Sequence, residues 1–173
     1  IDLSEQSIRY ASQFENERLY FAVHDMREVY KPEAFDFVLN LFTSFGYFNS
    51  ETENVVALHA AATTLKHGGK LVIDFMNTDR TIANLVAHEE KHLQGIDFHI
   101  SRRVEDGFII KTICFNDKGQ DFRFEERVRA LREEDFLEYF KMVQLRLVDV
   151  FGDYRLNSYV RESSDRIIFV LKK

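Results

Sequence analysis

The segment from Phe35 to Phe48 joins an apolar run to an equally apolar loop, and it limits the folds open to this chain more than any other segment. Its first half, Phe35–Leu41, predicts a buried β-strand. Loops are usually polar, because their backbone groups must meet water. An aromatic-rich loop directly after a strand therefore indicates a pocket wall, and in open α/β sheets pockets lie at the carboxyl ends of the strands. The alternative is a loop folded over the core.

Strand and helix patterns alternate over the first half of the chain. The predicted elements are a helix capped by Ser4 and reaching Glu15, a strand over 19–23, the strand 35–41, a helix opened by a Ser50–Glu53 capping box and ended by Gly68–Gly69, a strand over 70–75, and a helix from Asn77 or Thr78 to about His92. This rhythm predicts a largely parallel sheet with right-handed crossovers. The near-continuous apolar run 70–75 indicates helices on both faces of that sheet.

The pattern changes after residue 95, where apolar and polar residues alternate around two turns, Asp106–Gly107 and 116–119. This predicts a three-stranded antiparallel meander. Helix spacing returns over 133–143, and strands over 145–151 and 165–171 predict a closing antiparallel hairpin. We therefore predict an α/β core formed by residues 1–95 and 131–173, with residues 96–130 inserted as the antiparallel meander.

The bulk properties narrow the class of protein. A chain of 173 residues suits one domain. The net charge of −6 argues against a nucleic-acid partner or an anionic membrane surface. The lone cysteine, Cys114, excludes an internal disulfide and fits a reducing compartment, so we predict a cytoplasmic protein. No signal peptide or membrane-spanning segment is evident in the sequence.

Taken in order, several segments resemble a class I S-adenosylmethionine-dependent methyltransferase, a family with a Rossmann-like sheet. The resemblance covers nearly all of the chain. The matching pieces are Ile1–Ser4 (the end of the family's second strand), 24–27 (the loop after its third strand), 35–41 (its fourth strand), 68–73 (the turn and fifth strand) and the closing hairpin, which is reversed in this family. The resemblance implies an enzyme that transfers methyl groups to a small-molecule acceptor by in-line displacement, with S-adenosylmethionine as cofactor and no required metal.

One departure from the family is large. The family's first strand and the Gly-rich loop that cradles the methionine end of the cofactor have no counterpart in this sequence. The resemblance thus implies an additional N-terminal segment, half of a cofactor site in these residues, and a chain that is inactive without that segment.

The resemblance also assigns cofactor-binding roles. Asp2 would accept hydrogen bonds from the two ribose hydroxyls, and Leu3 would pack on the adenine. Asp25 would accept from the adenine amino group, with Met26 nearby. The methionine end would meet Asn40, Leu41 and Phe42, mostly through their backbone. Each has a simpler reading: Asp2 interacting with the following helix, Leu3 as ordinary core, Asp25 as a turn residue, Asn40 satisfying a strand end.

The acceptor would lie against the apolar loop. Phe45 and Tyr47 come from that loop, and Tyr154 precedes the final strand and could reach the same opening. Arg103 and Arg127 could bind an anionic acceptor, although cross-strand pairing with acidic neighbours explains them better. No catalytic residue is assigned.

Two other classes of function compete. His88–Glu89–Glu90–Lys91–His92 matches the His-Glu-x-x-His pattern of zinc hydrolases, which needs both histidines on one helix face. A solvated, charged helix end is the simpler explanation. A non-catalytic binding module is the other alternative, since a free edge of the inserted sheet could pair with a second copy and form a homodimer.

Overall fold

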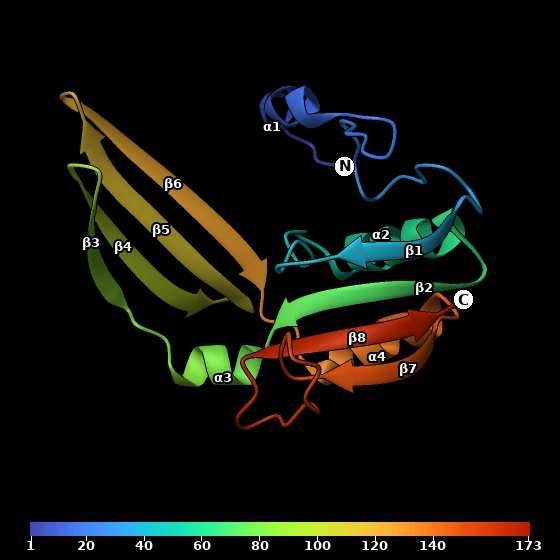
Figure 1. The fold of residues 1–173 in the computed structure, drawn as a ribbon. Coiled ribbons are helices and arrows are strands. Elements are labelled where there is room, and N and C mark those ends of the chain that lie inside the picture. Colours follow the sequence, from blue (N-terminus) through green and yellow to red (C-terminus); the bar gives the residue numbers. More distant parts are fainter.

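The computed structural model describes residues 1–173 (Figure 1). The elements in chain order are α1 (Glu5–Ala11), a 3₁₀ helix (Ser12–Phe14), β1 (Phe35–Asn40), α2 (Glu51–Thr64), β2 (Leu65–Met76), α3 (Thr78–Ala83), β3 (His88–Leu93), β4 (Ile96–Glu105), β5 (Phe108–Asp117), β6 (Gln120–Arg129), α4 (Glu133–Met142), β7 (Arg146–Phe151) and β8 (Arg166–Lys172). They form an α/β fold with two four-stranded sheets. No helix is long and apolar enough to cross a bilayer.

The core sheet has the order β1-β2-β8-β7. β1 pairs with β2 in parallel, whereas β8 is antiparallel to both of its neighbours. It follows that β1, β2 and β7 run in one direction and only β8 is reversed. The predicted closing hairpin is confirmed, and its last strand inserts next to β2 rather than adding at the edge.

Two helices, α2 and α4, cover one face of the core sheet. The Ser50–Glu53 capping box is confirmed, because each side chain bonds the other residue's backbone. α2 contacts β1, β2 and α4, while α4 contacts β7. The prediction of helices on both faces is wrong: on the other face Phe37 and Leu39 of β1 are each 59% exposed. The main core includes Leu58, Leu71, Ile73, Phe75, Phe136, Phe140 and Phe169.

Gly68 and Gly69 do not end the helix as predicted but lie inside β2. The helix ends at Thr64, and Leu65, which is fully buried, already pairs with Phe35. Gly68 has a φ of +77°, and a Cβ on Gly69 would lie only 3.0 Å from the carbonyl oxygen of Lys66. The pair therefore provides the irregular backbone where the β1–β2 register shifts. In the sequence, a glycine pair at such a shift looks the same as one that ends a helix.

The inserted sheet has four strands, not the predicted three. α3 ends at Ala83, and the residues assigned to its continuation form β3, which pairs with β4. The insertion therefore starts at His88 instead of residue 96. The physical reason is that α3 ends at its C-cap, Asn84, and residues 88–93 pair with β4 instead of continuing the helix. Figure 1 shows the carboxyl ends of β1 and β2 pointing toward this sheet.

The N-terminal segment is loosely organised. Ser4 caps α1 as predicted, but no residue of α1 is buried. The strand predicted over 19–23 is absent, and only isolated pairs remain, of which Asp2 with Val23 is parallel. Figure 1 shows α1 away from α2 and β1, whereas Arg27, later in this segment, binds Glu53 of α2.

Candidate functional site

A cavity of about 770 Å³ runs along the free edge of β1. Its walls come from the N-terminal segment, from β1 and the loop after it, and from α2. Of its 25 lining residues 19 are hydrophobic, and they include Ile1, Phe21, Met26, Leu39, Asn40, Leu41, Phe45 and Leu58. This size and composition are typical of small-molecule sites.

Asp2 does not itself line this cavity, although its neighbour Ile1 does, and it lies next to the backbone of Val23. Its amide donates to the carbonyl of Ala22 at 3.2 Å, and its carbonyl accepts from His24 at 2.9 Å. Its Oδ1 accepts from the amide of Ser4 at 2.7 Å, so the helix-leading interaction anticipated as an alternative is present. The Oδ2 atom accepts no hydrogen bond within the chain and is open to a ligand. Leu3 is exposed.

Asp25 lies two residues beyond the Asp2–Val23 pair, so the two carboxylates do come from neighbouring extended segments. Its oxygens accept from Nε and Nη2 of Arg27 at 2.5–3.1 Å. These hydrogen bonds hold the pKa of Asp25 below its usual range. Arg27 also reaches Glu53 at 2.6 Å and lies over the Phe48 ring. A ligand amine at Asp25 would therefore share its carboxylate with Arg27.

Asn40 and Met26 bring the segments on the two sides of the cavity into contact. The Nδ2 of Asn40 lies 3.9 Å from the sulfur of Met26, a weak contact. The Oδ1 of Asn40 is buried and has no hydrogen-bond partner. Buried polar atoms are nearly always satisfied. An unpaired amide oxygen in the wall of an apolar cavity therefore fits a ligand that carries an N–H or O–H donor.

The loop after Asn40 turns sharply. Phe42 and Thr43 have φ values of +58° and +60°, a conformation that is unfavourable for residues with a bulky or branched side chain. The Oδ2 of Asp74 accepts from the Phe42 amide at 2.7 Å, and the Asp74 carbonyl accepts from Thr43 at 3.0 Å. Asp74 is not among the residues predicted for the site from the sequence. A lone acidic residue inside the apolar run 70–75 was the available signal.

The three predicted acceptor residues are placed very differently. Phe45 is only 2% exposed and packs against Phe48 and Phe136, so it is a core residue at the inner wall of the cavity. Tyr47 is half exposed, and burial together with the charge of Glu126 on β6 raises its pKa. Tyr154 is exposed and its ring meets that of Phe42 at 6.2 Å.

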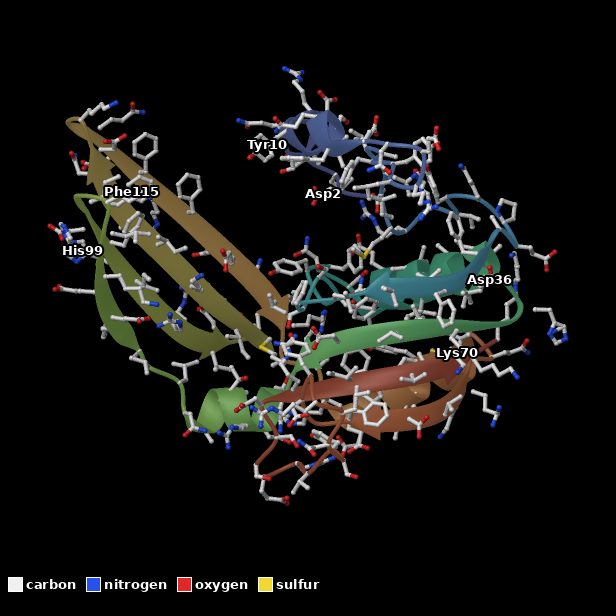
Figure 2. All side chains as sticks on the ribbon, viewed as in Figure 1. Asp2, Tyr10, Asp36, Lys70, His99 and Phe115 are labelled. Atoms are coloured by element: carbon white, nitrogen blue, oxygen red, sulfur yellow. The ribbon has the colours of Figure 1, made fainter.

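The inserted sheet presents an apolar face to the core. Phe115 stacks with Phe122 at 5.0 Å, and Phe98 and Phe124 extend this aromatic cluster. Figure 2 shows Phe115 on the side facing the core and His99 on the opposite side. Arg103 and Arg127 lie on that opposite side: Arg103 pairs with Glu105 at 2.8 Å, and Arg127 covers the Phe108 ring.

The helical premise of the zinc-hydrolase alternative is wrong. His88 and His92 lie on strand β3, where a spacing of four residues separates their Cα atoms by roughly 13 Å. The partner of His92 is Asp97, at 2.6 Å, and Glu89 binds Arg102 at 2.7 Å. The structure contains no group of three His, Cys, Asp or Glu residues that could hold a metal ion.

No family model matches the sequence, and neither does any curated protein. Solved structures do match. An S-adenosylmethionine-dependent methyltransferase from Clostridium acetobutylicum is 21% identical, with a TM-score of 0.82 over 99% of this chain and 72% of that one. The CcbJ methyltransferase from Streptomyces caelestis is 12% identical, with a TM-score of 0.82 over 98% of this chain and 76% of that one.

A third match is CalS10, an amino pentose methyltransferase from Micromonospora echinaspora solved with S-adenosylmethionine bound. It is 18% identical, with a TM-score of 0.74 over 98% of this chain and 71% of that one. At these identities the likeness establishes the fold. The expected Rossmann-like methyltransferase fold is thereby confirmed.

Proposed function

We propose that this chain carries the nucleoside and acceptor sites of an S-adenosylmethionine-dependent methyltransferase that acts on a small molecule. The observation that carries the proposal is the unpaired, buried amide oxygen of Asn40 in the wall of an apolar cavity. The shared fold supports it, since each of the three solved chains with that fold described above is a methyltransferase.

The cavity and the N-terminal segment beside it offer groups for both halves of a nucleoside. The free Oδ2 of Asp2 suits a ribose hydroxyl, and the edge of Asp25 suits an amino group shared with Arg27. Met26 supplies apolar surface for a purine ring, and the buried oxygen of Asn40 beside it accepts from an N–H or O–H group of the ligand. S-adenosylmethionine, when bound, supplies an activated methyl group and a good leaving group.

The acceptor in this proposal lies between the loop 41–48 and the inserted sheet. Displacement at a methyl group requires close approach, alignment and exclusion of water. Phe42, Tyr47 and Tyr154 furnish exposed aromatic surface on one side, and Phe124 of the Phe115 cluster furnishes it on the inserted sheet. A mostly apolar opening of this kind favours a small organic acceptor.

Calorimetry with S-adenosylhomocysteine tests the cofactor assignment. We expect binding by the unaltered chain, and a loss of about 1–3 kcal/mol of binding free energy in Asp2→Ala, because a hydroxyl then loses a charged acceptor. Asp36→Ala is the matched control, since that carboxylate pairs with Lys66 on an exposed strand away from Asp2. Equal affinities for all three proteins would refute the role of Asp2, and the absence of binding would refute the cofactor.

A further inference from the structure

Asp74 is the most thoroughly buried carboxylate near the proposed acceptor site, at 1% exposure. Its Oδ1 accepts from Nε of Arg166 at 2.7 Å. Its Oδ2 accepts from the Phe42 amide at 2.7 Å and from the Tyr154 hydroxyl at 3.0 Å. Three segments far apart in sequence therefore converge on one side chain.

Thr43 forms a second connection between the same segments. Its hydroxyl oxygen accepts from the Met76 amide at 3.1 Å and from Nη2 of Arg166 at 2.9 Å. Together with the Thr43 amide, which donates to the Asp74 carbonyl, these bonds fix residues 42 and 43 across the carboxyl end of β2. Left-handed backbone costs roughly 1–2 kcal/mol per residue, so the network must offset that cost twice.

The strained conformation does not bury an apolar side chain. Phe42 is 75% exposed, and Tyr154 beside it is 61% exposed. Tyrosine usually buries its ring and leaves its hydroxyl wet. Tyr154 does the reverse, because its hydroxyl points inward to Asp74 while its ring stays at the surface next to Phe42. Strain that holds the Phe42 ring in water, beside the exposed Tyr154 ring, indicates a binding surface.

We propose that Asp74 is a positioning residue: its buried carboxylate holds Phe42 and Tyr154 as one exposed aromatic platform, on which a flat ring of the acceptor stacks. The identity of the stacked ligand as a methyl acceptor rests on the proposed function, but the geometry of the platform does not depend on the cofactor. The guanidinium of Arg166 lies over the Tyr154 ring, 5.9 Å from its centroid, so this ring already has one cationic neighbour. An uncharged ring face is therefore the chemistry that the platform accepts best.

Amide hydrogen exchange of the unaltered chain and Asp74→Asn tests the positioning role. Asparagine offers one acceptor oxygen in place of two and adds donors that face Arg166 and Tyr154. We expect exchange at Phe42 and Thr43 to accelerate about tenfold or more, while Ile73 and Phe169 stay protected. Unchanged exchange at Phe42 would overturn the proposal, and so would an equal acceleration throughout the core, which is the sign of a merely structural residue.

Tyr154→Phe tests the same idea if Asp74→Asn fails to fold. It keeps the ring and removes only the hydroxyl, so the ring of residue 154 should lose its nuclear Overhauser contact with Phe42 while core exchange is unchanged. Tyr10→Phe is the matched control, because Tyr10 is equally exposed and lies on α1. Persistence of the Phe42 contact in Tyr154→Phe would contradict the role of the hydroxyl bond.

Indole at millimolar concentration serves as the ring-shaped ligand. It should shift the ring resonances of Phe42 and Tyr154 in the unaltered chain, and Asp74→Asn should abolish those shifts. The absence of shifts in the unaltered chain would refute the platform as a binding surface. This readout is separate from S-adenosylhomocysteine binding, so a failure of the proposed function and a failure of this inference are distinguishable.

Discussion

The two sides of the loop after β1 handle polar groups in opposite ways. On the β2 side, the buried carboxylate of Asp74 receives three hydrogen bonds from three segments. On the cavity side, the buried oxygen of Asn40 receives none. The side that must keep its shape is fully satisfied within the chain, while the side that faces the cavity leaves an acceptor open for a ligand.

The largest expected effect on stability, and the strongest test of this comparison, comes from Asp74→Ala. Removing the carboxylate leaves a mostly buried Arg166 without its partner, so we expect the free energy of unfolding to fall by about 3 kcal/mol. Urea denaturation measures it. Asp36→Ala, which removes an exposed pair with Lys66, should cost less than about 1 kcal/mol. Similar losses in both variants would show that Asp74 is not a special anchor.

Gly46→Ala tests whether the far end of the loop is packed as tightly. Gly46 has a φ of +89°, and a Cβ there would lie 3.1 Å from the Phe75 ring. We expect a loss of about 1–2 kcal/mol from the strained backbone and this crowding. Thermal unfolding measures it, with Gly107→Ala as control, because that glycine has a similar φ and open space around it. A loss no greater in Gly46→Ala than in Gly107→Ala would mean that the Phe75 contact is unimportant.

Asn40→Leu tests the cavity side and should act in the opposite direction. Replacing an unpaired amide by an apolar side chain should raise stability by about 1 kcal/mol, while binding of adenosine or S-adenosylhomocysteine weakens. The control is Asn54→Leu, since Asn54 also has an unpaired buried oxygen but does not line the cavity. Lower stability together with unchanged binding in Asn40→Leu would remove Asn40 from the site.

The smallest effect concerns the pKa of Asp25. Hydrogen bonds from Arg27 lower that pKa in the folded chain, so they stabilise the fold above the unfolded value and this contribution is lost as the pH falls through the folded pKa. In Arg27→Gln the pKa should rise toward its model-peptide value of 3.8. Carboxyl NMR titration measures it, with Asp153 as internal control, because Asn157 lowers the pKa of that carboxyl. If the pKa of Asp25 is the same in Arg27→Gln as in the unaltered chain, Arg27 is not the cause of the lowered pKa.

Local patterns in the sequence predicted much of the core. The Ser50–Glu53 box, the strand predicted over Phe35–Leu41 and the closing hairpin depend on short-range signals. The structure has all three, with the strand ending one residue earlier at Asn40. The strand β3 was missed because its pairing with β4 is a tertiary contact, and charged residues in 88–93 carry no strand preference. Gly68 was predicted to end a helix because its place in β2 depends on the pairing of β2 with β1, which is also a tertiary contact.

The candidate site was predictable only in part. The resemblance pointed to Asp2, Asp25 and Asn40; Asn40 lines the cavity along β1, whereas Asp2 and Asp25 lie on the N-terminal segment outside the cavity lining. The sequence does not reveal that Arg27 already binds Asp25, or that Phe45 is buried. Asp74 was missed because its three donors come from residues 42, 154 and 166, which meet only in the folded chain.

The most direct test of the account is a titration of the ¹⁵N-labelled chain with adenosine, followed residue by residue. The account predicts shifts of the amides of Ala22, Met26 and Leu41, which line the cavity, and none on the far strand β7. The same titration of Asn40→Leu should show smaller shifts. Shifts confined to the inserted sheet, or identical shifts in both proteins, would contradict a nucleoside site at the edge of β1.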